Sequence, residues 1–157
     1  ERHLTSDPPT AAEVAAASAD VSAALDAAQK HVAFWPTATL VGVAGTVTTI
    51  TAHVLDLDEY DSAAVDGAVL PVDPVLKACR ELLLLSRARR GRLPFLHPGR
   101  VDVIGAGALI WSDLVVRVRA EVARKGGRLR SVVTSERDLL DGLALAAAAE
   151  PGRFTLR

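Results

Sequence analysis

The sequence predicts an α/β domain that is rich in helices and contains few strands. Half of its 157 residues are hydrophobic while only 4% are aromatic, so Ala, Val and Leu must supply the core, and alanine-rich segments favour helices. Helical and extended patterns alternate along the chain, which is typical of layered α/β packing. The length suits one domain over residues 1–157 and is too short for two comfortable ones.

The N-terminal part is predicted to form a long amphipathic helix. Thr10 and Glu13 have the spacing of a capping box, in which each side chain satisfies a backbone N–H of the other residue. The helix is expected to continue to about His31, and Pro36 ends the segment. Its apolar stripe consists of residues spaced by seven, four, three and four positions: Val14, Val21, Leu25, Ala28 and Val32.

The rest of the chain alternates between strands, loops and helices. In order, we expect a strand at Thr39–Val43, a helix over 46–55, an acidic loop at Asp56–Asp61, an extended piece over 65–70, a helix over 73–85, a basic linker at Arg87–Gly99, a helix at Val101–Arg119, a strand at Leu129–Val133 and a last helix over 135–149. The first strand lacks polar alternation, so both of its faces should be covered, as in parallel sheets. Asp73 and Ser135 are suitable N-caps for the helices that they precede, and Asp138 and Asp141 suit the early turns of the last one.

Two clear strands are too few for a stable sheet, which normally needs three or more. The chain also contains no methionine and opens on Glu1. We therefore expect a fragment that is truncated at its N-terminus, with the remaining strands before residue 1.

Charge is distributed unevenly although the net charge is only −1. Residues 1–75 hold eleven acidic and two basic residues, whereas residues 76–157 hold eight and sixteen. A basic half suits an anionic ligand, but two complementary halves that fold against each other explain the same pattern. The densest basic run, Arg87–Arg92, would either steer a polyanion or form a solvated connector, and the sequence does not decide between them.

Several other kinds of site find little support. The four histidines have no metal-ligand spacing, and the acidic loop lacks the glycine and terminal glutamate of a calcium-binding hand. Cys79, the single cysteine, sits among helix formers, which predicts a buried and inert thiol. The basic run lacks interleaved aromatic residues that would stack on bases, which argues against nucleic acid. No apolar run is long enough to cross a membrane and no targeting segment is evident, so we expect no membrane association and a cytoplasmic protein.

The segment Leu40–His53, LVGVAGTVTTITAH, carries the strongest functional signal. A strand that runs through Gly42 and Gly45 into a helix can bring backbone close to a phosphate, and the first helical turn presents unpaired N–H groups with a partial positive charge. Thr46 and Thr48 would add hydroxyl donors. The packing of a helix against a strand also demands small residues, so the bend alone is a weak signal.

Three motifs in a fixed order strengthen this signal. They are LVGVAGTVTTITAHVLDLDEYD, LPFLHPGRVDVIGAGALI and VVTSERDLLDGLALA. Together with the N-terminal ERHLTSDPPTAAEV, they resemble the exopolyphosphatase and guanosine pentaphosphate phosphatase family in its actinobacterial form, over nearly the whole chain. The resemblance implies a ribonuclease H-like fold of the actin-like ATPase superfamily, in which two lobes close on a phosphate chain.

The resemblance also implies roles for individual residues. The phosphate- or nucleotide-binding loop would comprise Gly42, Ala44, Gly45, Thr46 and Thr48. An interlobe connecting helix, where small residues allow close packing, would involve Arg100, Asp102, Gly105 and Gly107. Family members often carry Ser or Gly at the position of Ala44, which removes a hydroxyl contact here but no backbone contact. From their spacing near a helix start, Arg100 and Asp102 are expected to form a capping or interdomain ion pair.

By the same resemblance, the intact protein would hydrolyse the terminal phosphate of inorganic polyphosphate, or convert guanosine pentaphosphate to tetraphosphate, with Mg²⁺ neutralising phosphate oxygens. The family's water-activating glutamate and its Asp-x-Gly-Ser and Gly-Gly-Gly-Ser loops do not occur in this chain. The chain would then be most of the second, C-terminal lobe without its opening strands, and inactive by itself. Its partners would be the first lobe and, in a homodimer, a second copy of the full protein.

Two rival functions stay open at this point. One is a non-catalytic domain of the same fold that senses phosphates or nucleotides, and the upstream sequence would identify it by a substituted glutamate and phosphate loop. The other is a kinase of the same superfamily, which would consume ATP in the presence of an acceptor instead of releasing phosphate from polyphosphate.

Overall fold

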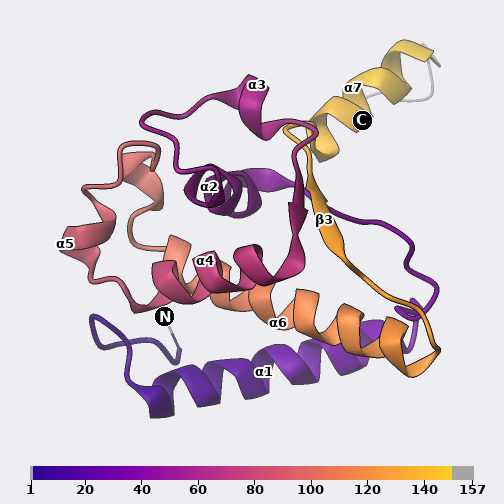
Figure 1. The fold of residues 1–157 in the computed structure, drawn as a ribbon, viewed down its shortest axis with the longest axis horizontal. Helices are drawn as coiled ribbons and strands as arrows, with labels where there is room; N and C mark the ends of the chain where they lie inside the picture. The colour runs from indigo at the N-terminus through magenta and orange to yellow at the C-terminus, as the bar shows by residue number, and fades with distance from the viewer. Residues whose placement is uncertain (1, 150–157) are drawn as a thin grey trace, which may run out of the picture.

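The computed structural model describes residues 2–149, in which helices dominate and three short strands form one small sheet (Figure 1). The elements in chain order are α1 (Ala11–Gln29), β1 (Leu40–Gly42), α2 (Ala44–Val54), α3 (Ser62–Val65), β2 (Val69–Pro71), α4 (Val72–Leu84), α5 (Arg87–Arg90), a 3₁₀ turn (Pro98–Arg100), α6 (Ile104–Arg124), β3 (Ser131–Thr134) and α7 (Leu139–Ala149). None of the described helices is both long enough and apolar enough to span a membrane.

The sheet confirms the α/β prediction with few strands, and its strand order is β1-β3-β2. β1 runs parallel to β3, but β2 runs antiparallel to it, so the sheet is mixed and the expectation of parallel strands alone is wrong. β2 forms within and just beyond the predicted extended piece, at an edge where the missing N–H of Pro71 is tolerated. The prediction that both faces of the first strand are covered is also wrong, because Val41 is 51% exposed.

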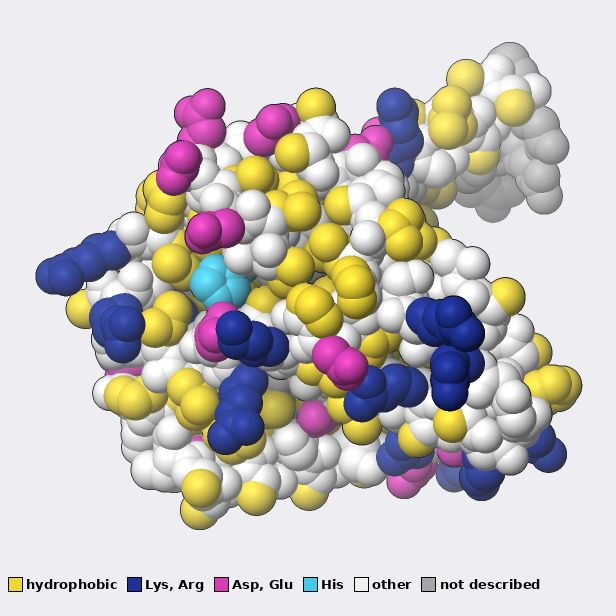
Figure 2. Space-filling model, in the orientation of Figure 1, with side chains coloured by type: hydrophobic (Ala, Val, Ile, Leu, Met, Phe, Trp, Pro, Cys, Tyr) yellow, Lys and Arg dark blue, Asp and Glu magenta, His cyan; other side chains and the backbone are white. Residues whose placement is uncertain are grey.

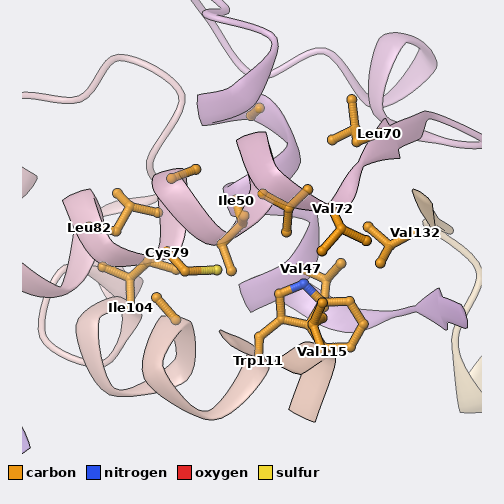
Figure 3. Packing of buried hydrophobic residues seen from close by; sticks show 14 of the residues in the cluster. Val47, Ile50, Leu70, Val72, Cys79, Leu82, Ile104, Trp111, Val115 and Val132 are labelled. Carbon is orange, nitrogen blue, oxygen red and sulfur yellow. The ribbon is translucent and has the colours of Figure 1, made fainter. Parts of the chain in front are cut away.

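The core lies where α2, α4 and α6 pack together beside the sheet (Figure 3). Ile50, Leu82 and Ile104, one from each helix, are almost completely buried. Trp111 from α6 and Val132 from β3 extend the cluster towards the sheet (Figure 3). Burial of this apolar surface is the main force that holds the three helices against one another.

Two polar groups of the core are accounted for. The hydroxyl groups of Thr51 and Thr134 share a buried hydrogen bond of 2.5 Å, which joins α2 to β3. Cys79 is buried as predicted, and its burial raises the pKa of the thiol to about 12. The thiol therefore stays protonated and unreactive at neutral pH.

The capping box of α1 is confirmed. The Thr10 hydroxyl accepts a hydrogen bond from the Glu13 N–H at 3.3 Å, and the Glu13 carboxylate accepts one from the Thr10 N–H at 2.7 Å. The predicted stripe is only partly buried: Val14, Val21 and Leu25 are half-buried, while Ala28 and Val32 are exposed. Val32 lies beyond the end of α1 at Gln29, and the buried contacts of the helix lie nearer its start, where Ala17 packs with Leu83 of α4 and Leu109 of α6.

The two other predicted N-caps are wrong. α4 begins one residue before Asp73, whose carboxylate accepts a hydrogen bond from Arg119 at 2.6 Å. α7 begins four residues after Ser135. The carboxylate of Asp138 accepts from the Leu140 N–H at 2.8 Å, and that of Asp141 accepts from the Asp138 N–H at 2.9 Å. The supporting role predicted for these two acidic residues is therefore confirmed.

The basic linker predicted at Arg87–Gly99 is structured and is not solvated throughout. It contains α5 and the 3₁₀ turn, and Arg90 at the end of α5 is only 8% exposed. The Arg90 guanidinium donates to the Asp7 carboxylate at 3.3 Å, across the interface between the two oppositely charged halves of the sequence. The following helix, α6, begins three residues later than predicted and extends five residues further.

Replacing Leu82 tests the position of the core. Leu82→Ala should lower the free energy of unfolding by about 2–5 kcal/mol, because it leaves a cavity among residues that cannot fully collapse. Leu84 is 46% exposed on the same helix, so Leu84→Ala should lower the free energy of unfolding by less than about 1 kcal/mol. Urea denaturation followed by circular dichroism measures both values. Equal losses would contradict this core.

The acid sensitivity of the α1 start gives a second test. Hydrogen bonds from the Thr5 hydroxyl and from backbone N–H groups of Thr10, Thr5 and Ser6 hold the pKa of Glu13 well below its usual 4.5. A carboxyl group whose pKa is lowered by folding stabilises the folded protein fully at a pH above the pKa that the group has in the unfolded chain. This contribution disappears as the pH falls from 4.5 towards the lower pKa of the folded state. Stability should therefore fall more steeply on acidification in the wild type than in Glu13→Gln. Urea midpoints at neutral and acidic pH measure this, and parallel losses would refute it.

Candidate functional site

The bend between β1 and α2 exposes the start of a helix. β1 ends at Gly42 and α2 begins at Ala44, whose φ of 69° lies in the left-handed region that residues with a side chain rarely adopt. The N-cap, Val43, provides no side-chain hydrogen bond. The first N–H groups of α2 thus have no side-chain cap, and they carry the positive end of the helix dipole.

The side chain of Arg100 covers this bend. Its Nη1 donates to the carbonyl oxygen of Gly45 at 3.3 Å and to the hydroxyl of Thr49 at 3.4 Å. A Cβ atom on Gly45 would overlap the guanidinium group, so only glycine permits this approach. A fixed positive charge therefore lies beside the N-terminal turn of α2, which makes the bend an electropositive corner.

The predicted ion pair between Arg100 and Asp102 is wrong. Asp102 pairs with Arg87 instead, and the hydrogen bond from that guanidinium holds the pKa of Asp102 below its usual value. Asp102 thus faces α5, whereas Arg100 faces α2. Arg100 and Asp102, although two positions apart in the sequence, thus contact different helices.

The small residues of α6 allow it to meet α2 and α5 closely. A Cβ on Gly107 would lie 2.5 Å from the Thr46 hydroxyl, and one on Gly105 would lie 2.5 Å from Nη1 of Arg90. Both glycines therefore allow close packing within this chain, and the interlobe role that the resemblance implies stays a prediction. The structure thus brings Thr46 against Gly107 and Gly45 against Arg100, whereas Gly105 and Asp102 face α5.

The remaining loop residues lie in different surroundings. Gly42 is buried, and a Cβ there would lie 2.7 Å from Val47 and 2.8 Å from Trp111, so its small size serves packing. The hydroxyl of Thr48 is buried and donates back to the Gly45 carbonyl at 3.4 Å. Ala44 is exposed at the tip of the bend. These positions leave the backbone of residues 44–46 as the accessible part of the loop.

A cavity of about 360 Å³ adjoins Arg100, and we refer to it as the bend cavity. Its lining residues are Tyr60, Pro94, Phe95, Leu96, His97, Pro98, Arg100 and Glu136. The Tyr60 hydroxyl donates a hydrogen bond to the Glu136 carboxylate, and partial burial together with this carboxylate raises the pKa of Tyr60. The Glu136 carboxylate is therefore held by Tyr60 at the wall of the bend cavity.

Tyr60 and Glu136 carry no signal in the sequence. They are 76 positions apart, and the tertiary fold brings the acidic loop next to the second residue after β3. Arg100 was predicted to matter, but as part of an ion pair. Only the structure shows that it lies on Gly45.

The described residues do not form a metal site. Over residues 2–149, no three histidine, cysteine or acidic side chains gather in a way that could hold a metal ion. Near the bend, the Glu136 carboxylate is occupied by Tyr60, and Asp102 by Arg87. The Mg²⁺ that the resemblance implies thus finds no donor set built from these residues.

Comparison with known proteins identifies the family of this chain. The sequence profile of the Ppx/GppA phosphatase family matches residues 1–125. The chain belongs to the Ppx/GppA phosphatase family. Exopolyphosphatase 2 from Mycobacterium tuberculosis is 38% identical over 148 residues, covering 94% of this chain but 45% of the relative. The Ppx/GppA chain described here therefore spans less than half the length of these curated relatives.

Solved structures agree with this assignment. The crystal structure of an exopolyphosphatase-like protein has a TM-score of 0.91 and 41% identity, with 94% of this chain and 46% of that chain covered. A Ppx/GppA family member from Aquifex aeolicus has a TM-score of 0.75 at 23% identity, with 97% of this chain and 45% of that chain covered. The second likeness concerns the fold alone. The predicted superfamily fold is confirmed by these Ppx/GppA neighbours.

The contact between Gly107 and Thr46 can be tested by substitution. Gly107→Ala should lower the free energy of unfolding by about 1–3 kcal/mol, because the added methyl overlaps the Thr46 side chain. Thr46→Ala in the same protein should recover most of this loss, since it removes the two closest atoms. Gly142 on α7 faces open space, so Gly142→Ala should be neutral or slightly stabilising. Additive effects of the first two changes in a double-mutant cycle would exclude the contact.

Proposed function

We propose that the intact protein is a phosphoanhydride hydrolase that removes the terminal phosphate of inorganic polyphosphate, and that this chain is the C-terminal lobe of that enzyme. The supporting observation is the Arg100 guanidinium on Gly45, beside the uncapped first turn of α2. The printed names of the relatives, exopolyphosphatase 2 and an exopolyphosphatase-like protein, support the choice of substrate. Conversion of guanosine pentaphosphate is the alternative activity of the same site.

The bend binds phosphate oxygens through two kinds of donor. The N–H groups of residues 44–46 point along the axis of α2 and supply fixed dipoles that need no rearrangement. Arg100 uses Nη1 to hold itself to Gly45 and Thr49, which leaves its other N–H groups for phosphate oxygens. Together they stabilise the negative charge that the phosphoryl group carries during transfer.

The attacking water must be activated by another part of the protein. Glu136, the carboxylate that lines the bend cavity, is engaged by Tyr60 and sits beside a raised-pKa phenol, so it is not available as a base. The first lobe supplies the base and the ligands of any Mg²⁺. This chain supplies the binding of the phosphate chain and the charge stabilisation, and by itself it releases no phosphate.

Replacing Arg100 in the intact protein tests this role. Arg100→Gln should lower kcat for phosphate release from tripolyphosphate by roughly 100-fold, because it removes a charged donor that strengthens as the transition state forms. Arg100→Lys should retain an intermediate rate, since lysine keeps the positive charge but lacks the paired N–H donors of the guanidinium group. Phosphate release measured by a coupled colorimetric assay gives both rates.

Arg124→Gln is the matched control. Arg124 is an exposed arginine that pairs within α6 with Glu121, and its loss should leave the rate unchanged. An unchanged rate in Arg100→Gln would refute the proposal. Tripolyphosphate that binds to the wild type without turnover would instead identify a phosphate-sensing domain.

A further inference from the structure

A second cavity, of about 720 Å³, opens between α2, α4 and α5, and we refer to it as the basic groove. Its lining residues are His53, Lys77, Arg80, Glu81, Leu84, Leu85, Arg89, Arg92 and Leu93. Figure 2 shows dark blue side chains gathered around a histidine on the face where α4 and α5 lie. Four cations thus surround a floor of leucine side chains, and nothing in the proposed chemistry of the bend accounts for them.

Most of this positive charge is not neutralised within the protein. Among residues 2–149, the side chains of Arg80, Arg89 and Arg92 take part in no ion pair or hydrogen bond of the structure. Glu81, the one acidic residue of the groove, is shared by His53 at 3.1 Å and Lys77 at 3.7 Å. The apolar floor lowers the local dielectric, which strengthens the attraction of an anion to these cations.

The basic groove adjoins the bend cavity. Arg92 and Leu93 line the groove, and the next residues of the chain, from Pro94 to Pro98, line the bend cavity. The rings of His53, in the groove, and Phe95, in the bend cavity, lie 5.7 Å apart and form the wall between the two. α2 itself runs from the bend to His53, a helix of 11 residues and hence about 16 Å long.

We infer that the basic groove binds the distal phosphates of a long polyphosphate chain whose terminal phosphate lies at the bend. This inference rests on the proposed function and adds a second subsite to it. A linear chain with one negative charge in each unit matches this arrangement, in which Arg100 lies at one cavity and Arg80, Arg89 and Arg92 line the neighbouring one. A leucine floor offers no surface on which bases would stack, so the groove does not suit nucleic acid.

The second subsite makes affinity depend on chain length. Tripolyphosphate reaches only the bend, whereas a long chain contacts the bend and the groove at once. The second contact is then intramolecular and takes place at a high effective concentration, which increases the overall affinity without changing the first site. The gain is electrostatic, so it decreases as salt concentration rises.

The test uses the intact protein with Arg80, Arg89 and Arg92 all changed to Gln. Fluorescence anisotropy measures the Kd of labelled long-chain polyphosphate and, by competition, that of tripolyphosphate. The triple variant should raise the Kd of the long chain by at least about tenfold. It should leave the Kd of tripolyphosphate within about twofold of wild type, which also shows that the protein is folded. The slope of log Kd against log salt should fall by roughly 2 for the long chain.

A second triple variant serves as the matched control. Lys125, Arg128 and Arg130 are exposed and lie between α6 and β3, at the opposite end of the molecule from α5 (Figure 1). Changing these three to Gln removes the same charge, and it should leave the Kd of both ligands unchanged.

The outcomes separate this inference from the proposed function. An equal loss of affinity for both chain lengths, no loss for either, or an equal loss in the control variant would overturn the basic groove as a subsite. Competition by polyglutamate as effective as that by long-chain polyphosphate would also overturn it, since the groove would then bind any acidic polymer. If Arg100→Gln leaves phosphate release from tripolyphosphate unchanged while the groove variant loses long chains, the proposed function fails and the groove stands.

Discussion

At the junction of α2 and α6, the absence of a side chain on Gly107 makes room for Thr46, and Arg100, just ahead of α6, reaches over Gly45 to its carbonyl oxygen. The shape of the bend follows from this close approach. A helix that stood further from α2 would leave Arg100 too short to cover Gly45. The buried cluster of Ile50, Leu82 and Ile104 holds α2 and α6 together. The packing of the core therefore also sets the geometry of the bend.

Pairing between the two halves accounts for part of the uneven charge of the sequence. Some cations of the second half do join the acidic first half: Arg90 pairs with Asp7, Arg117 with Asp26 and Arg119 with Asp73. The cations of the basic groove do not, and they gather beside the cavity that contains Arg100. Folding thus uses one part of the positive charge, and the remaining part is available to an anionic ligand.

The sequence predicts those features that depend on local chemistry. The Thr10 capping box and the strand-bend-helix at Gly45 follow from spacing and residue type, and both lie where they were expected. The failures depend on tertiary contacts. Asp73 pairs with Arg119 from another helix, Asp102 pairs with Arg87, and Arg100 donates to the Gly45 carbonyl. No local pattern encodes the choice between such partners, nor the meeting of Tyr60 with Glu136.

The backbone N–H of Gly45 is the group on which this account depends most. Glycine-selective ¹⁵N labelling of the intact protein, with the Gly45 signal identified by its loss in Gly45→Ala, allows this amide to be followed during titration with tripolyphosphate. The account predicts a saturable shift of the Gly45 signal while Gly126 and Gly127, in the turn after α6, do not move. A Gly45 signal that stays in place while tripolyphosphate binds to the protein would contradict it.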